Sequence, residues 1–173
     1  MENQKMLTKK MEKALNNQLN AEFYSSYLYL SMSAFCSILN MNGAANWMKM
    51  QSEEEHMHAM KIFDFIIDRD GKVNLKKIED PATEWKSITD VFEDVQKHEA
   101  LVTKSINDLV DLAIHEKDHA VTTFLQWFVT EQVEEEATVK TIVDKLKLVG
   151  DNSVALFMID GELAQRPAPT PIQ

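Results

Sequence analysis

The spacing of apolar residues along the chain predicts four long helices. Apolar side chains recur every three or four positions, the spacing of one helix face, over residues 6–37, 44–69, 87–116 and 119–148. No segment alternates apolar and polar residues as a half-buried strand does. A shorter fifth helix is predicted over 152–164, ahead of a proline-rich tail. These features predict an all-α protein.

The connections between the predicted helices indicate their topology. Gly43 is expected in a short turn after the first helix, and Gly71 at the C-terminal cap of the second. The segment 71–86 has no helical period and is long enough to run the length of a bundle. Ser87 and Asp90 resemble the capping box that begins a helix. Because a short turn also joins the third and fourth helices, two antiparallel hairpins joined by one long crossover are predicted, which is a four-helix bundle.

Each predicted helix becomes acidic at the middle of its apolar face. Along the third helix that face consists of Phe92, Val95, Glu99, Val102, Ile106, Leu109 and Ala113. Glu22, Glu55 and Glu135 occupy the midpoints of the other three helices. Antiparallel packing would bring all four carboxylates to one level of the core, where unpaired charges are costly and repel one another. Since no Lys or Arg lies on these faces near the midpoints, the sequence predicts either raised pKa values or bound cations.

Length and composition narrow the class of protein. The 173 residues correspond to one domain at about 150 residues per domain, expected over 1–165, with the tail over 166–173. The net charge of −10 argues against a nucleic-acid partner, which needs a basic patch, and against an anionic membrane surface. The single Cys36 indicates a reducing compartment. With no apolar leader and no apolar run of about 20 residues, a cytoplasmic location is expected.

An internal repeat supports a shared polar site. Shifting the chain by 77 residues superposes Glu22 on Glu99, Glu55 on Gln132 and His58 on Glu135. The two hairpins are therefore expected to be related by a pseudo-twofold axis that passes through the polar cluster. The first hairpin carries Glu-x-x-His and the second Gln-x-x-Glu. Because residues three apart share a helix face, each pair can hold one ion.

The ligand types favour a first-row divalent ion such as iron or manganese, because carboxylates and one imidazole are present and thiolates are not. The first ion is expected to be bound by Glu22, Glu55 and His58. Glu55 would bridge to a second ion, whose other ligands are expected to be Glu99, Glu135 and, more weakly as a neutral amide, Gln132.

These residues and their neighbours resemble the non-haem ferritins of prokaryotes over about residues 5–165. The strings that carry the resemblance are NAEFYSSYLY at 20–29, EEEHMH at 53–58, KHE at 97–99, and FLQW followed by EQVEEE within 124–136. The resemblance implies a ferritin-like bundle with a di-iron ferroxidase centre, which oxidises Fe(II) with oxygen or hydrogen peroxide. It also implies a homo-oligomeric shell of 24 subunits that stores ferric mineral.

The resemblance also implies a third iron site and a subtype. By position, its ligands would be Glu54, Glu131 and Glu134, with Glu135 available for sharing. The residue pattern alone leaves open that these acids form a solvated face. Haem is not expected, because His56 stands where a bacterioferritin carries its haem-ligating methionine. One cysteine is too few for the rubredoxin domain of a rubrerythrin.

Several other residues have more than one interpretation. Tyr29, two turns from Glu22, is expected to be a hydrogen-bond donor or electron source beside the ions, or simply a packed core residue. His98 is expected to be exposed. His115 and His119 flank the turn between the third and fourth helices, where a cation near the end of a helix is favourable, and lining a pore is the alternative. Cys36 is expected to be a small packed residue. Two other functions remain open: a di-iron enzyme acting on an organic molecule, and a structural bundle whose acids only keep it in solution.

Overall fold

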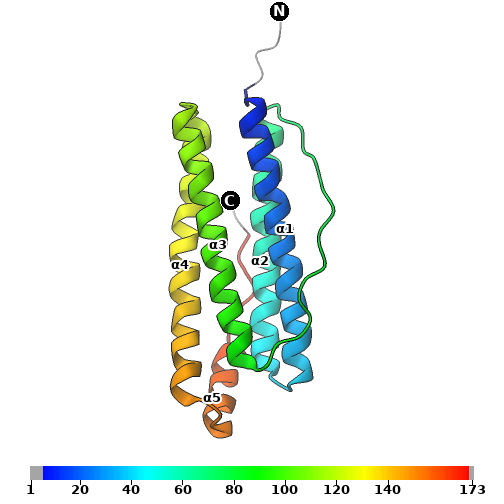
Figure 1. The fold of residues 1–173 in the computed structure, drawn as a ribbon, viewed down its shortest axis with the longest axis vertical. Helices are drawn as coiled ribbons and strands as arrows, with labels where there is room; N and C mark the ends of the chain where they lie inside the picture. The colour runs from blue at the N-terminus through cyan, green and yellow to red at the C-terminus, as the bar shows by residue number, and fades with distance from the viewer. Residues whose placement is uncertain (1–5, 172–173) are drawn as a thin grey trace, which may run out of the picture.

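The computed structural model describes residues 6–171, and its helices follow the predicted order (Figure 1). They are α1 (Lys9–Ile38), α2 (Asn42–Asp68), α3 (Ile88–His115), α4 (His119–Val149) and α5 (Ser153–Leu163). Within 6–171 there is no strand. The hairpins α1–α2 and α3–α4 lie side by side, the crossover joins opposite ends of α2 and α3, and α5 lies at one end of the bundle. The all-α four-helix bundle with one long crossover and a short fifth helix is confirmed.

Side-chain caps explain where α1 and α3 begin. The Thr8 hydroxyl accepts a hydrogen bond from the Met11 amide, so α1 begins three residues later than predicted. The Ser87 hydroxyl accepts from the Asp90 amide at 3.2 Å, as expected for a capping box. In a capping box the carboxylate would accept from the amide of the cap residue, Ser87. Here the Asp90 carboxylate accepts instead from the amide of Lys86, at 2.9 Å.

The prediction for Gly43 was wrong, because the residue lies in the first turn of α2. A Cβ at this position would lie 1.8 Å from the backbone oxygen of Asp160, so only glycine allows α5 to approach this closely. The Asp160 carboxylate accepts from the amides of Gly43 and Ala44 at 3.0 and 2.8 Å. It therefore caps α2, a role that sequence reasoning could not assign to a residue 117 positions away.

The prediction for Gly71 was wrong by one residue. The left-handed residue that ends α2 is Asp70, with φ of 52°. Aspartate tolerates this conformation better than most residues because its short polar side chain bonds locally. Gly71 follows it and donates its amide to the Ile66 carbonyl at 2.8 Å, the closing bond of a helix C-terminus.

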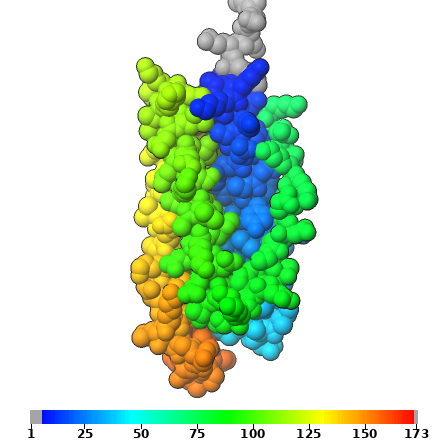
Figure 2. All heavy atoms as spheres, in the orientation of Figure 1, coloured from blue at the N-terminus to red at the C-terminus, as the bar shows by residue number. Residues whose placement is uncertain are grey.

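The crossover is attached to α1 along its length, which keeps it on the outside of the bundle (Figures 1 and 2). Asn16 donates to the Lys72 carbonyl at 2.9 Å and accepts from the Asn74 amide at 2.6 Å. One turn later, Asn20 donates to the Asn74 carbonyl and accepts from the Lys76 amide. These two asparagines satisfy backbone groups that no helix or sheet satisfies.

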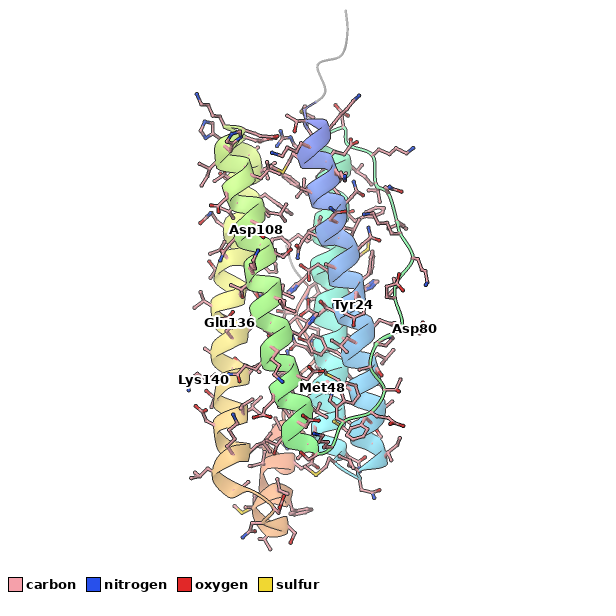
Figure 3. All side chains as sticks on the ribbon, viewed as in Figure 1. Tyr24, Met48, Asp80, Asp108, Glu136 and Lys140 are labelled. Carbon is pink, nitrogen blue, oxygen red and sulfur yellow. The ribbon has the colours of Figure 1, made fainter. Side chains whose placement is uncertain are left out.

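The core consists of two apolar clusters, one on each side of a central polar layer. One contains Met32, Met48 and Phe92, and the other contains Leu15 and Ile62 with their neighbours. Figure 3 shows Met48 between the helices, whereas Asp108 and Lys140 project from the outer faces. The predicted face of α3 is buried at every position. The polar layer is formed by Gln18, Glu22, Ser25, Gln51, Glu55, His58, Glu99, Gln132 and Glu135, all buried.

The helix bounds match the internal repeat. α1 and α3 end at Ile38 and His115, and α2 and α4 begin at Asn42 and His119, each pair 77 positions apart.

In 6–171, none of the helices is long and apolar enough to cross a bilayer.

Candidate metal centre

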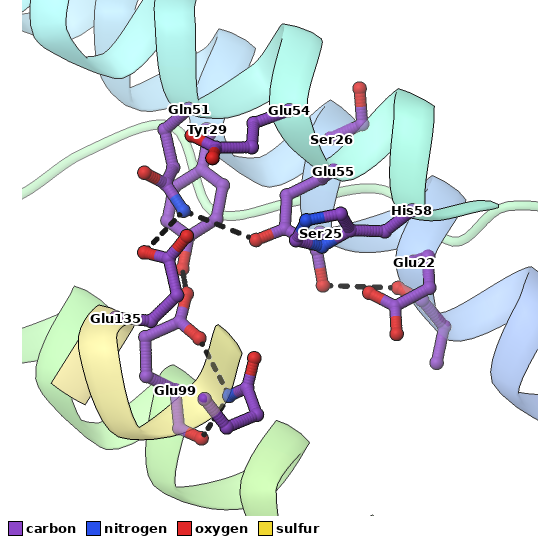
Figure 4. Close-up of polar contacts among 12 residues, drawn as sticks. Glu22, Ser25, Ser26, Tyr29, Gln51, Glu54, Glu55, His58, Glu99 and Glu135 are labelled. Atoms are coloured by element: carbon purple, nitrogen blue, oxygen red, sulfur yellow. Dashed lines mark hydrogen bonds and ion pairs between the residues drawn. The ribbon is translucent and has the colours of Figure 1, made fainter. Parts of the chain in front are cut away.

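The first hairpin brings Glu22, Glu55 and His58 together in the polar layer (Figure 4). Each offers one ligand atom within 4.8 Å of the others, and each side chain is almost fully buried. Glu55 and His58 lie one helical turn apart, so His58 Nδ1 is 3.2 Å from Glu55 Oε2. Glu22 Oε2 and His58 Nε2 have no hydrogen-bond partner. Buried polar atoms without partners are costly, and a bound cation would satisfy both kinds of atom.

The second hairpin places Glu99 and Glu135 opposite this cluster, and the buried Gln132 contacts Glu99. The Tyr29 hydroxyl donates to Glu99 Oε1, and Gln132 Nε2 donates to Glu99 Oε2 at 3.1 Å. Gln51 Nε2 donates to Glu135 Oε2 at 3.0 Å. The residues predicted to bind the second ion therefore share one buried layer. There the side-chain amides of Gln51 and Gln132 and the phenol of Tyr29 donate hydrogen bonds to the carboxylates.

Two further glutamines support the carboxylates, and sequence reasoning had not given them this role. Gln51 Nε2 also lies 3.2 Å from Glu55 Oε1, so this amide links α2 to α4. Gln18 Nε2 donates to Glu22 Oε1 at 2.7 Å, and its own oxygen accepts from the Ser105 hydroxyl. The signal was present in the sequence, since each glutamine lies four residues before a predicted ligand on the same helix face.

Burial and mutual repulsion raise the pKa values of these carboxyl groups. Desolvation, followed by repulsion from Glu55, raises the pKa of Glu22 well above its usual value. Desolvation, followed by repulsion from Glu99, raises the pKa of Glu55 in the same direction and that of Glu135 to about 7. The metal-free site therefore retains protons near neutral pH, and a cation that binds there must displace them.

Tyr29 has a protonated hydroxyl in direct contact with the site. Burial, followed by repulsion from Glu99, raises its pKa well above the usual value. Its position as a hydrogen-bond donor agrees with one of the predicted roles, because the phenol keeps its proton and points it at Glu99 Oε1.

The prediction that His98 is exposed was wrong. This residue is half-buried, its Nε2 lies 2.8 Å from Ser25 Oγ, and its ring meets Tyr29 edge-on at 5.8 Å. α1 packs against this side of α3, and the resulting burial lowers the pKa of His98. His115 and His119 are exposed beside the turn between α3 and α4, and Cys36 is buried, as predicted for a small packed residue.

A second group of potential ligands lies beside the first and shares His58. Glu54, His58 and Glu131 each offer a ligand atom within 4.8 Å of the others. Desolvation raises the pKa of Glu131. Glu134, expected from the resemblance to belong here, is exposed and lies outside this group, although its charge acts on Glu131. The structure thus pairs Glu54 and Glu131 with a histidine that had been placed only in the first site.

A four-helix bundle with buried carboxylates and an imidazole at its centre defines a class of metal-binding proteins. Residues 12–149 match the model of the ferritin family, whose description is ferritin-like domain. This match covers most of the chain, so the protein belongs to the ferritin family.

Individual relatives agree with this placement. A protein named bacterial non-heme ferritin from Bacteroides fragilis is 47% identical over 161 residues, which cover 93% of this chain and 100% of that protein. One of the same name from Campylobacter jejuni is 42% identical over 155 residues, covering 90% and 93% of the two chains. The solved open-pore ferritin of the archaeon Archaeoglobus fulgidus is 50% identical, with a TM-score of 0.93 over 94% of this chain and 99% of that one.

Proposed function

We propose that the protein stores iron and that its buried carboxylate layer is a ferroxidase centre. The observation that carries this proposal is the cluster of Glu22, Glu55 and His58, which is buried, within coordinating distance and supplied with ligand atoms that have no partner. In a member of the ferritin family, Fe(II) is the expected substrate of such a cluster. Carboxylate oxygens with one imidazole suit iron, and anionic ligands favour Fe(III) over Fe(II).

The residues have distinct parts in the proposed reaction. One Fe(II) ion is bound by Glu22, Glu55 and His58, and a second by Glu55, Glu99 and Glu135, with Gln132 as a weak ligand. Each ion gives one electron to dioxygen or hydrogen peroxide, and the carboxyl protons leave as the ions bind. Gln18 and Gln51 hold the carboxylates in place, and the Tyr29 hydroxyl orients Glu99.

The proposal extends to assembly and partners. The Fe(III) product is stored as an oxyhydroxide mineral inside a homo-oligomeric shell of 24 subunits. The excess of ten acidic over basic residues would attract Fe(II) and argues against a nucleic-acid partner. We propose a cytoplasmic protein that carries no haem.

The test combines Glu22→Ala with His58→Ala. Metal-free protein is loaded with Fe(II) without oxygen and then mixed with air-saturated buffer, while ferric absorbance and particle size are followed together. We expect the parent to oxidise iron rapidly and retain it in a large particle, and the double variant to lose the rapid phase. The control is Glu53→Ala with His56→Ala, which removes the same residue types from the exposed side of α2.

Each outcome separates the proposal from its alternatives. Rapid oxidation that survives in the double variant would refute the assigned site. A parent that neither oxidises iron nor assembles would be a structural bundle. A parent that retains no iron but consumes oxygen with an organic molecule would be a di-iron enzyme of another kind.

A further inference from the structure

The segment after α5 turns back along the bundle and reaches the level of the polar layer (Figure 1). Residues 164–171 contain no regular helix beyond the last turn of α5. The Arg166 carbonyl accepts from the Asn46 side chain at 3.4 Å, which attaches the segment to the first part of α2. We call residues 166–171 the C-terminal strap.

Arg166 is the residue that fixes the strap. Its Nη2 lies 2.5 Å from Glu54 Oε2, its Nη1 donates to the Trp47 carbonyl at 3.4 Å, and its guanidinium lies 4.3 Å above the Trp47 ring. The guanidinium and the carboxylate are both mostly buried, with 19% and 24% of the side chains exposed. An aromatic face and a carboxylate together are the surroundings in which arginine is held most firmly.

The strap ends over the second group of potential ligands. Thr170 and Pro171 line a cavity of about 230 Å³ whose other walls are Glu54, Met57, His58, Trp127 and Glu131. His58 is 2% exposed and its Nε2 has no hydrogen-bond partner, although its Nδ1 contacts Glu55. This nitrogen marks the cavity as a place for a cation while the first site is empty. Because a neutral imidazole has one free lone pair, His58 can bind an ion in only one of the two sites at a time, so an ion in this cavity is held by Glu54 and Glu131 when the first site is filled.

We propose that Arg166 is an internal counter-cation, which occupies Glu54 when no metal is bound and competes with the ion that binds Glu54 and Glu131 beside His58. This inference rests on the proposed function, because that ion is Fe(II) on its way to or from the ferroxidase centre. The strap thereby sets this site to a lower affinity than the buried first site, so that an ion held here can be released.

Arg166 weakens cation binding in two ways. A cation can use both oxygens of Glu54 only if the guanidinium leaves, so the energy of the existing ion pair opposes binding. A guanidinium that remains nearby repels the cation directly. For a partly exposed ion pair, the expected effect on affinity is about fivefold.

The test measures metal affinity and not turnover. Zn²⁺, which does not change oxidation state, is titrated calorimetrically into the metal-free, full-length protein. We expect Arg166→Met, which keeps the contact with Trp47 but removes the charge, to tighten the weaker class of Zn²⁺ sites about fivefold. Arg166→Lys keeps the charge and is expected to behave like the parent. Lys145→Gln removes one positive charge from an exposed pair with Glu162 and is the control for net charge.

A double-mutant cycle assigns the effect to Glu54. In a Glu54→Gln background, Arg166→Met is expected to tighten Zn²⁺ binding by less than in the parent background, because only the direct repulsion remains to be removed. Unchanged or weaker binding by Arg166→Met in the parent background would overturn the inference, as would an effect of the same size without Glu54. The first class of sites reports on the proposed function separately. If the parent lacks tight Zn²⁺ binding that depends on Glu22 and His58, the proposed function fails; if only the Arg166 effect is missing, the inference alone fails.

Discussion

Glu135 should make the metal-free protein less stable as the pH rises. Its carboxyl is buried and its pKa is about 7 in the folded protein, against a usual value of 4.5. Below pH 4.5 the group is protonated in both folded and unfolded chains and has no effect. Between 4.5 and 7 the unfolded chain releases the proton while the folded protein retains it, so stability falls with rising pH. Above 7 both forms are ionised and the effect is constant.

The magnitude follows from the size of this shift. One pKa unit corresponds to about 1.4 kcal/mol, so the shift of Glu135 amounts to about 3 kcal/mol. Glu135→Gln mimics the protonated carboxyl and can still accept the hydrogen bond from Gln51. The variant should equal the parent at pH 4.5 and be more stable by about 3 kcal/mol at pH 7.5.

The assay is scanning calorimetry of chelator-treated parent and variant across this pH range. For a chain of this length, 3 kcal/mol corresponds to a Tm difference of about 10 °C. Glu134→Gln changes the exposed neighbour and should show no such pH-dependent difference. A Tm difference between Glu135→Gln and the parent that stays constant from pH 4.5 to 7.5 would refute the reasoning, because it would show that Glu135 ionises normally in the folded protein.

Three further outcomes follow from the structure. Zn²⁺ binding should release more protons at pH 6 than at pH 8.5, because the raised pKa values of Glu55 and Glu135 leave these carboxyls protonated at the lower pH. Proton release is measured in weakly buffered solution, and equal release at the two pH values would contradict this. Gly43→Ala should cost about 2 kcal/mol in denaturant unfolding, since its Cβ would overlap α5, whereas Gly161→Ala, with open space around its Cβ, should not destabilise. Ser87→Ala should cost about 1 kcal/mol through loss of the α3 cap; no change in the unfolding midpoint would exclude that role.

The bundle and its central polar layer could be predicted from the sequence because both depend on local periodicity. The apolar faces recur at helical spacing, and a carboxylate that interrupts them, such as Glu99, is visible without knowing the partner helices. The loop lengths then determined how the helices pair.

Other features could not be predicted, because they depend on contacts between distant segments. Asp160 caps α2, and Arg166 reaches Glu54 across 112 positions, yet neither has a periodic pattern that would indicate its partner. His98 is covered because α1 passes over it, which helix spacing alone does not reveal. Such contacts arise where α5 and the strap meet the bundle and where the two hairpins meet, and they account for the corrections at Gly43 and His98.

The division of the bundle into two hairpins has a consequence for its internal motions. α1 packs closely along α2, and α3 along α4, whereas the hairpins meet more sparsely and mainly through α1 and α3. The polar layer bridges this weaker plane, with Glu22 and Glu55 on one side and Glu99 and Glu135 on the other. Small relative movements of the two hairpins should therefore be easier than movements within one hairpin in the metal-free fold, although both apolar clusters hold the hairpins together. A cation held by both hairpins would close that plane, and the protein would become more rigid as it is filled.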